Sequence, residues 1–323
     1  MQNRTLLTLF IFLTFINTSL SADALTQYRN YGIQNIEKQM DADLASKVYW
    51  DSYLKNIDTR FGYIESYTNI LACDKSRSTL TLYMKDDNTS YVKTKQYSAF
   101  TGKIKGDKAR EGDLRTPNGV YTLIKKLTKV DSFYGPMAFV TSYPNSYDKY
   151  EGKGGHGIWI HGLPTSQERD SFTKGCIAIN NPSIKCLDRN IDIKKTVLII
   201  SESKRTEASK NLLSNVLAQL YAWRYAWLYN DIRTYLQFYD DSFIRFDGMN
   251  ITNFRNYKKR VFNKKESKKI IFKNINVIPY PGTSDMYKVT FSEIYRSSSF
   301  SFIGDKVLIL KLKDSKIRII TEK

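Results

Sequence analysis

Both histidines of this 323-residue chain, His156 and His161, lie in one stretch with the cysteine Cys176. A thiol has an ordinary pKa near ~8.5, so a nucleophilic cysteine needs a base or a positive charge beside it, and imidazole is the usual base. Cys176 follows His161 by 15 residues, which is enough for a strand to end, a loop to turn and the chain to return. These residue types at this spacing predict a cysteine nucleophile activated by a histidine.

The neighbours of Cys176 fit that chemistry, but they also fit a simpler role. Gly175 allows close backbone approach, so that main-chain N–H groups can point at the oxyanion of a tetrahedral intermediate. A lone cysteine followed by Ile177–Ile179 is also typical of a small buried apolar side chain. His161 follows three apolar residues and could equally be a strand-end histidine held by a backbone hydrogen bond. Taken singly, the two residues leave both interpretations open.

Three motifs in a fixed order resolve the choice. The string Ile-His-Gly at 160–162 is followed by Thr-Lys-Gly-Cys-Ile at 173–177, and upstream lie RTPNGVY at 115–121 and ILACDKSRSTLTLY at 70–83. Over about residues 67–203 these motifs resemble the L,D-transpeptidase (YkuD) family of cell-wall enzymes. The resemblance implies that Cys176 is the nucleophile, that His161 is its base and that the backbone carbonyl of Gly162 orients His161.

The same resemblance implies an oxyanion hole made by the amides around Gly175 and Cys176. Further candidate oxyanion or substrate-binding residues are Thr173, Lys174, His156 and Trp159. His156 could also be a plain loop histidine, because its distance of five residues from His161 suits neither a helical pair nor an HExxH metal motif. We therefore expect no metal and no organic cofactor.

Two positions depart from the family pattern. Most members have a His two residues before the cysteine, where this chain has Lys174, and commonly an Arg two residues after it, where this chain has Ala178. Lysine offers a point charge but not the bidentate geometry of a guanidinium, which disfavours ordinary cross-linking. Together with an appended C-terminal domain, these changes resemble the cell-shape-determining murein carboxypeptidases of helical bacteria, a branch that trims rather than cross-links.

The predicted function is therefore that of a cysteine peptidase, a murein L,D-carboxypeptidase that trims tetrapeptide stems to tripeptides through a thioester and so affects cell shape. One alternative is an L,D-transpeptidase that passes the same thioester to a second stem. A non-catalytic wall- or glycan-binding protein is the alternative of another class, and the intact pair of His161 and Cys176 argues against it. Sortases carry their His much further upstream and papain-like peptidases place Cys before His, so both are disfavoured.

Residues 1–24 are expected to be a signal peptide, because Arg4 precedes an apolar run at 6–16 that is too short to span a bilayer and small residues follow it. This predicts export to the periplasm. In that compartment the formal net charge of +18 favours murein or membrane surfaces over nucleic acid as partners. A merely solvated basic surface is equally consistent.

The chain has three cysteines, which are too few for a disulfide framework. If Cys176 is the nucleophile, Cys73 and Cys186 remain. They could form a disulfide in an oxidising compartment or stay as two free thiols, and the sequence leaves both open.

Residues 25–66 have a helical pattern, followed by a β-rich catalytic domain at 67–203. A helical stripe requires a cover, which could be the catalytic domain or a second copy, so a homodimerisation arm is one hypothesis. The apolar residues that recur at helical spacing on this stripe are Ile33, Ile36, Met40, Leu44 and Val48.

Residues 204–323 begin with aromatic-rich helices and continue into strands. This order resembles the NTF2-like fold, a cone that often encloses a pocket. The aromatic side chains Trp223, Trp227 and Tyr235 are either core residues or, as a group, the lining of a pocket for a wall sugar or peptide. The expected fold class is α+β, with N-terminal helices, a β-rich L,D-transpeptidase-like domain and a C-terminal NTF2-like cone.

Overall fold

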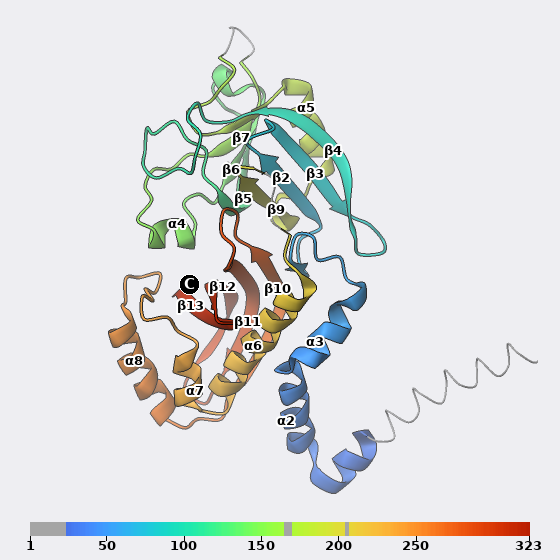
Figure 1. Ribbon diagram of the computed structural model, residues 1–323, viewed down its shortest axis with the longest axis vertical. Coiled ribbons are helices and arrows are strands. Elements are labelled where there is room, and N and C mark those ends of the chain that lie inside the picture. Colours follow the sequence, from blue (N-terminus) through green and yellow to red (C-terminus); the bar gives the residue numbers. More distant parts are fainter. Residues whose placement is uncertain (1–23, 165–169, 204–206) are drawn as a thin grey trace, which may run out of the picture.

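The computed structural model describes residues 24–164, 170–203 and 207–323. A β-barrel forms one end of the molecule, a curved sheet with helices forms the other, and the N-terminal helices run beside the sheet half (Figure 1). The predicted α+β class is confirmed. Nearly all of the expected signal peptide lies outside the described residues. Among the helices that are described, none is long and apolar enough to cross a membrane.

The barrel is closed, with strand order β2-β3-β4-β8-β7-β6-β5-β9. Its first and last strands pair in parallel, which completes the ring. The strands are β2 (Asn69–Asp74), β3 (Thr79–Lys85), β4 (Tyr91–Phe100), β5 (Gly119–Leu127), β6 (Ala138–Thr141), β7 (Trp159–His161), β8 (Ile177–Ile179) and β9 (Thr196–Ser201). The helices between them are η2 (Ser132–Tyr134), α4 (Ser146–Tyr150), α5 (Asn181–Asn190) and η3 (Ile193–Lys195).

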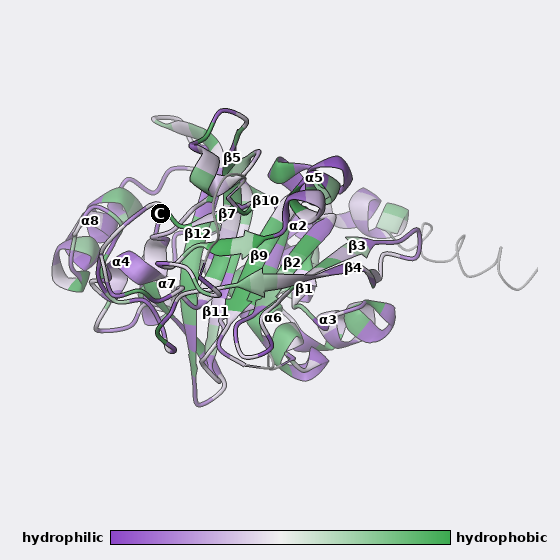
Figure 2. Ribbon diagram, turned by 90° about the horizontal axis from the view of Figure 1, so that it is seen from above, coloured by the Kyte–Doolittle hydropathy of each residue, from purple (hydrophilic) through white to green (hydrophobic). Residues whose placement is uncertain are grey.

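Local sequence explains the opening hairpins. Strand β3 carries the alternation expected of a half-buried strand, and the polar turn after it is closed by Asp86, whose carbonyl accepts from Thr89 N (3.0 Å) and whose carboxylate accepts from Ser90 N (2.7 Å). Strands of the barrel such as β9 are strongly hydrophobic (Figure 2). Their inward side chains, among them Leu71, Leu198 and Ile200, form one buried core.

The C-terminal half is a five-stranded antiparallel sheet wrapped around helices, with strand order β1-β10-β11-β12-β13. Its elements are β1 (Tyr63–Ile64), α6 (Lys210–Leu228), α7 (Ile232–Gln237), α8 (Ile251–Asn263), β10 (Lys269–Pro279), β11 (Met286–Arg296), β12 (Ser301–Lys313) and β13 (Lys316–Glu322). Strand β1 comes from the N-terminal segment, so this sheet is built from both ends of the chain.

The two faces of the sheet have different partners. On β11, Val289 and Phe291 pack on α6 in the C-terminal core, whereas Met286 and the residues in phase with it face the barrel. On that second face the sheet shares a buried cluster with barrel residues such as Val197 and Ile199. The barrel and the sheet are therefore joined by a continuous apolar contact.

The N-terminal segment differs from the expected helix. Helical structure covers residues 24–31, α2 (Ile33–Leu44), α3 (Lys47–Tyr53) and η1 (Leu54–Asn56), and ends before the strand β1 instead of filling the whole segment 25–66. The face of α2 that meets α6 carries Asp41, whose carboxylate pairs with Arg224 at 2.7 Å. The predicted stripe therefore turns partly outward, and Ile33, Met40 and Val48 are more than half exposed.

The helices α4, α5 and α8 were not predicted from the sequence. Helix α8 buries only Phe254 and Phe262, eight positions apart, and the residues between them are mostly polar. Its low content of apolar residues therefore hides it. Helix α7 ends at Gln237, and Tyr239 then bridges to Ile319 of the sheet.

Candidate active site

His161 ends strand β7, and Cys176 stands directly before strand β8. The two strands pair in parallel, with Ile160 opposite Ile177 and His161 opposite Ala178. Side chains alternate between the two faces of a strand, so His161 and Cys176 share one face while Ile160 and Ile177 point into the barrel core. The fold thus brings the two predicted residues onto neighbouring strands.

A backbone carbonyl fixes the orientation of the imidazole. His161 is 1% exposed, and its Nδ1 lies 2.6 Å from the carbonyl oxygen of Gly162. A carbonyl only accepts hydrogen bonds, so Nδ1 must carry the proton and Nε2 is the basic nitrogen of the neutral ring. The edge of the Tyr134 ring contacts the imidazole at a centroid distance of 5.0 Å. With the proton on Nδ1, Nε2 is free to accept the proton of the thiol, as a general base must.

Gly162 could not be replaced without moving this arrangement. A Cβ at Gly162 would lie 2.3 Å from Oδ1 of Asn181 and 2.8 Å from the ring of Pro136. The amide of Asn181 in turn holds Leu163, accepting from its N (2.8 Å) and donating to its O (3.0 Å). Asn181 therefore supports the chain just after His161, a role that no sequence pattern indicated.

The thiol of Cys176 is half-buried beside the start of β7. The amide of Trp159 donates toward Sγ at 3.5 Å, and Sγ lies 3.4 Å from the carbonyl oxygen of Gly157. The sulfur thus accepts from one backbone group, and the thiol donates to another. Trp159 thus contributes its backbone to the nucleophile, while its half-buried ring lies tilted against that of Tyr134, with a centroid distance of 5.1 Å.

A chain of hydrogen bonds holds the loop before Cys176. Thr116 is fully buried and donates through Oγ1 to the carbonyl oxygen of Gly175 at 2.9 Å. Thr173 Oγ1 donates to the carbonyl oxygen of Cys176 at 2.7 Å. A Cβ at Gly175, whose φ is +133°, would meet the carbonyl oxygen of Arg115 at 2.9 Å. The segment around Thr116 therefore sets the position of the nucleophile.

The structure supports some of the remaining candidate residues less well than others. The Gly175 amide already donates to Thr173 Oγ1 at 3.0 Å, so an oxyanion would have to compete with that bond, and the oxyanion role stays a prediction. Lys174 is exposed. His156 is 83% exposed and faces Glu111 at 3.9 Å, which places it in an outer loop instead of against the thiol.

Arg115 is a residue to which the sequence assigned no separate role. Its Nε is buried, with no hydrogen-bond partner among the described residues, and its carbonyl approaches Gly175. Ala178, at the position of the family's usual arginine, is fully buried between His161 on β7 and Phe100 on β4. The backbone of Arg115 thus packs against the nucleophile loop, whereas its guanidinium lies near Gly106.

The other two cysteines are free thiols. Cys73 points into the barrel core, and burial raises the pKa of its thiol to about 12. Cys186 lies on α5, with Sγ 3.8 Å from the hydroxyl of Tyr97. In the part of the chain that the structure describes, no group of three metal-ligating side chains is found.

A closed barrel with a cysteine and a tautomer-fixed histidine on adjacent parallel strands defines a candidate thiol acyl-transfer site. Residues 68–200 match the L,D-transpeptidase catalytic domain of the YkuD family, and residues 215–323 match the Cds6 C-terminal NTF2-like domain. The predicted family and the NTF2-like domain are confirmed.

Solved structures support the same assignment over most of the chain. The helical cell shape determining protein Pgp2 from Campylobacter jejuni is 37% identical, with a TM-score of 0.80, and the match covers 86% of this chain and 99% of Pgp2. Bd1075 from Bdellovibrio bacteriovorus is 27% identical, with a TM-score of 0.65, over 80% of this chain and 92% of that protein. This chain therefore belongs to the L,D-transpeptidase (YkuD) family, and this membership supports a murein-modifying role.

The relation to curated proteins is narrower. YafK of Escherichia coli, whose name marks it as a candidate L,D-transpeptidase, is 32% identical over 111 residues. The match covers 34% of this chain and only 42% of the length of YafK. YafK thus supports the assignment of the family for a part of the chain.

Proposed function

We propose that this protein is a periplasmic murein L,D-carboxypeptidase that removes the terminal D-alanine from tetrapeptide stems. The observation that carries the proposal is the pairing of β7 with β8, which brings Cys176 onto the same face as a buried His161. The fixed Nδ1 proton of His161 gives the pair the polarity of a nucleophile and its base.

In the proposed reaction, His161 Nε2 takes the Cys176 proton and the thiolate attacks the carbonyl carbon at the L-centre of diaminopimelate. The C–N bond to D-alanine breaks as the imidazolium returns its proton to the leaving amine, and a thioester remains. His161 then deprotonates a water molecule that attacks the thioester. The products are the tripeptide carboxylate, free D-alanine and regenerated Cys176.

Trimming is preferred over cross-linking because of the residues that would hold the stem. The family's usual arginine is replaced by buried Ala178, so one guanidinium that binds a charged stem is missing at that position. We infer that a second stem therefore has less to bind and that water reaches the thioester first.

We further propose that the C-terminal domain binds a wall sugar or peptide in the cavity of its cone. This cavity has a volume of about 220 Å³ and is lined by Trp227, Tyr295 and Phe302 together with the charged Lys258 and Glu293. Trp223 and Tyr235, which the sequence placed in the same group, are core residues at 2% and 0% exposure. The pocket is thus aromatic, but only in part from the predicted side chains.

A second copy of the chain is the proposed cover for the N-terminal helices. Tyr28, Tyr31, Ile33, Met40 and Val48 are each at least half exposed on this arm. Exposed apolar side chains gathered on one arm favour association.

The experiment that tests the main proposal is digestion of disaccharide-tetrapeptide with the purified protein, followed by mass spectrometry. We expect disaccharide-tripeptide and D-alanine in equal amounts. Dimers joined through two diaminopimelate residues as the main product would instead identify a transpeptidase. Unchanged tetrapeptide would exclude both activities on this substrate.

A further inference from the structure

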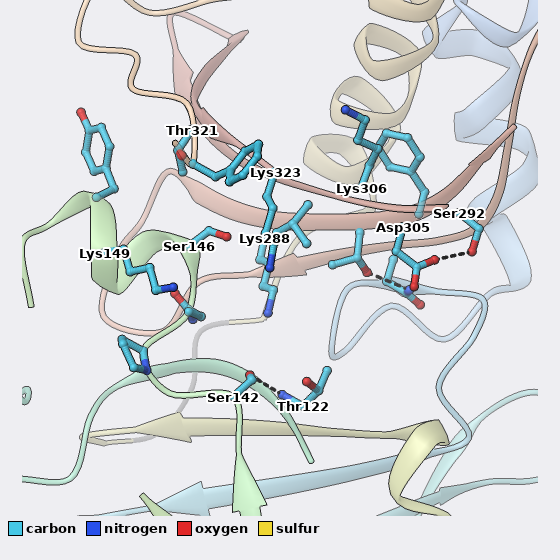
Figure 3. A pocket seen from close by; sticks show the side chains of 18 of the residues that line it. Thr122, Ser142, Ser146, Lys149, Lys288, Ser292, Asp305, Lys306, Thr321 and Lys323 are labelled. Carbon is cyan, nitrogen blue, oxygen red and sulfur yellow. Dashed lines mark hydrogen bonds between the residues drawn. The ribbon is translucent and has the colours of Figure 1, made fainter. Parts of the chain in front are cut away.

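Lys75 and Lys288 are two buried lysines that donate to backbone carbonyl groups of the barrel domain. Lys288 projects from β11 into a cavity of about 850 Å³ between the barrel and the C-terminal sheet (Figure 3), and its Nζ lies 2.9 Å from the carbonyl oxygen of Val120. Lys75 directly follows β2 and does not line this cavity, and its side chain is only 4% exposed. Lys75 is therefore a cation enclosed within the catalytic domain.

The ammonium group of Lys75 joins distant parts of the catalytic domain. Its Nζ donates to the carbonyl oxygens of Gly106 (2.6 Å) and Thr116 (2.8 Å) and to Oδ1 of Asn118 (3.2 Å). A fourth contact is the ion pair with Oε2 of Glu202 at 2.6 Å. An ammonium group has three protons to donate, so each of them has an acceptor here. Lys75 thus holds the segment 106–118 from inside the domain.

The ion pair of Lys75 and Glu202 lies where the barrel closes. The parallel pairing of β2 with β9 continues past both strands, because Lys75 N donates to Ser201 O and Ser76 N donates to Glu202 O, each at 3.0 Å. Partial burial disfavours the charged form of Glu202, but the hydrogen bonds from Lys75 and from the Gly106 amide hold the pKa of this carboxyl below its usual value. The segment 106–118 is therefore tied to a fixed point of the fold.

Thr116 connects Lys75 to the nucleophile loop. Its carbonyl oxygen accepts from Lys75, and its hydroxyl group donates to the carbonyl oxygen of Gly175 at 2.9 Å and accepts from the Gly102 amide at 2.8 Å. Thr116 is 0% exposed, so water does not replace these partners. Because Gly175 directly precedes Cys176, a shift of Thr116 would move the thiol.

A second series of contacts leads from Lys75 to the other side of the thiol. Lys75 holds the carbonyl group of Gly106, and the next residue, Asp107, pairs with Lys153 at 2.6 Å. Lys153 lies four residues before Gly157, whose carbonyl oxygen is 3.4 Å from the thiol sulfur. Two loops that contact the nucleophile are thus supported from one buried ammonium group.

We propose that Lys75 is a positioning residue for the nucleophile, which together with Glu202 fixes the segment 106–118 and thereby the place of Cys176. The inference rests on the proposed function for its thiol chemistry, but Lys75 acts through Thr116 and not on the substrate. An apolar core often stabilises a fold as well as a buried ion pair does, whereas directed hydrogen bonds hold the backbone in one arrangement. Without the ammonium group, buried carbonyl groups would lose their donor and the segment would shift.

The test compares full-length Lys75→Met with the wild-type protein. Alkylation of Cys176 by iodoacetamide is followed by peptide mass spectrometry below the melting temperature of both proteins. We expect the rate constant to fall roughly tenfold, because a thiol displaced from its base forms less thiolate. On disaccharide-tetrapeptide, kcat should fall by a similar factor while KM changes less than about twofold, since the variant alters the nucleophile and not the binding of the stem.

A second variant covers the case that Lys75→Met does not fold. Glu202→Gln removes one charge from a side chain that is 37% exposed, and it should lower the alkylation rate and kcat in the same direction by about threefold, because the ammonium group is held less firmly. The matched control is Lys126→Met, which breaks the 2.6 Å ion pair with Asp188 between β5 and α5 of the same domain. Both rates should be unchanged in this control.

Three results would overturn the proposal. The first is an unchanged alkylation rate in Lys75→Met and Glu202→Gln with a lower melting temperature, which would leave these residues a role in stability alone. The second is an equal loss of rate in Lys126→Met. The third is a wild-type Cys176 that reacts no faster than Cys186, because there would then be no activated thiol to position. If Cys176 reacts rapidly but the wild-type protein releases no D-alanine, the carboxypeptidase is refuted, while the alkylation rates still decide the role of Lys75.

Discussion

The candidate active site and the pocket of the C-terminal cone are built on opposite principles. Around Cys176, positions are set by neutral hydrogen bonds of the backbone and of Thr116 and Thr173. In the cone, buried charges approach one another instead, and Oε1 of Glu293 and Nε1 of Trp227 have no hydrogen-bond partner among the described residues. The first site is organised without a ligand, whereas the second has polar groups that a ligand would satisfy.

This difference in hydrogen bonding distinguishes a site built for catalysis from a site built for binding. A catalytic pair has to hold its geometry before the substrate arrives, and fixed backbone groups provide that order at little cost. A binding pocket can leave buried groups unsatisfied, because the ligand supplies the missing bonds. Three predictions test this contrast, starting with the largest effect, and a fourth concerns the N-terminal arm.

Replacing the nucleophile should produce the largest change. Cys176→Ala is expected to fold normally and to lose at least roughly 10³-fold in kcat, because no other group supplies the thioester. His161→Gln should be comparably inactive. The measurement is release of D-alanine from disaccharide-tetrapeptide.

The control for this prediction uses groups that lie outside the site. His156→Ala should keep most of the rate, because its side chain is 83% exposed in an outer loop. Cys186→Ala should also remain active. If His156→Ala abolished turnover and His161→Gln did not, the assignment of the base would be wrong.

Gly162→Ala should have the next largest effect. The added methyl group would overlap Asn181 Oδ1 and Pro136, so the carbonyl that orients His161 has to move. We expect kcat to fall by roughly 10²-fold, as for other small displacements of a catalytic group. Gly154→Ala is the matched control, since nothing lies within 4 Å of its added Cβ. Equal activity of the two variants would show that the orientation of His161 does not depend on Gly162.

The buried carboxyl group of Glu293 in the pocket of the cone should make the free energy of unfolding depend on pH. Burial raises the pKa of Glu293 from 4.5 to about 7, so between these values the folded state binds more protons than the unfolded state. Stability should therefore fall as pH rises through this window. Glu293→Gln should remove that fall and be more stable than the wild type at pH 8 by about 1 to 3 kcal/mol. The measurement is the free energy of unfolding in urea at pH 5 and pH 8 for both proteins. If the two proteins show the same change with pH, Glu293 does not have a raised pKa in the folded state.

The smallest effect on catalysis is expected at the N-terminal arm. Met40→Asp combined with Val48→Asp places charges on side chains that are 57% and 76% exposed. If the arm joins two copies, the apparent mass in light scattering should fall to that of a monomer while the rate on disaccharide-tetrapeptide changes less than about twofold. A wild-type protein that is monomeric at high concentration would contradict the dimer.

The active site was predictable because its chemistry depends on rare residues in a short stretch. With two histidines and one cysteine close together, few pairings exist, and the motif around 160–177 indicated one of them. The supports were not predictable. Asn181 reaches Leu163 across 18 residues and Thr116 reaches Gly175 across 59, and no local pattern encodes such contacts.

The fold was predictable where apolar residues are frequent. Helix α6 and strands β3 and β10 to β13 are rich in them, whereas α8 is mostly polar and was missed. For the N-terminal segment, the prediction of the buried face failed for a different reason. Its stripe has a helical period, but the Asp41–Arg224 ion pair, which joins positions far apart in sequence, decides which face turns inward.

The pairing of β1 with β10 has a consequence for the order in which the protein is made. Tyr63 lies opposite Val277, so the strand that completes the C-terminal sheet leaves the ribosome long before its partner. The barrel, in contrast, can close once Ser201 has emerged, because β9 is its last strand. A contact between such distant parts of the sequence forms slowly. Strand β1 must therefore wait, unpaired, until β10 is available.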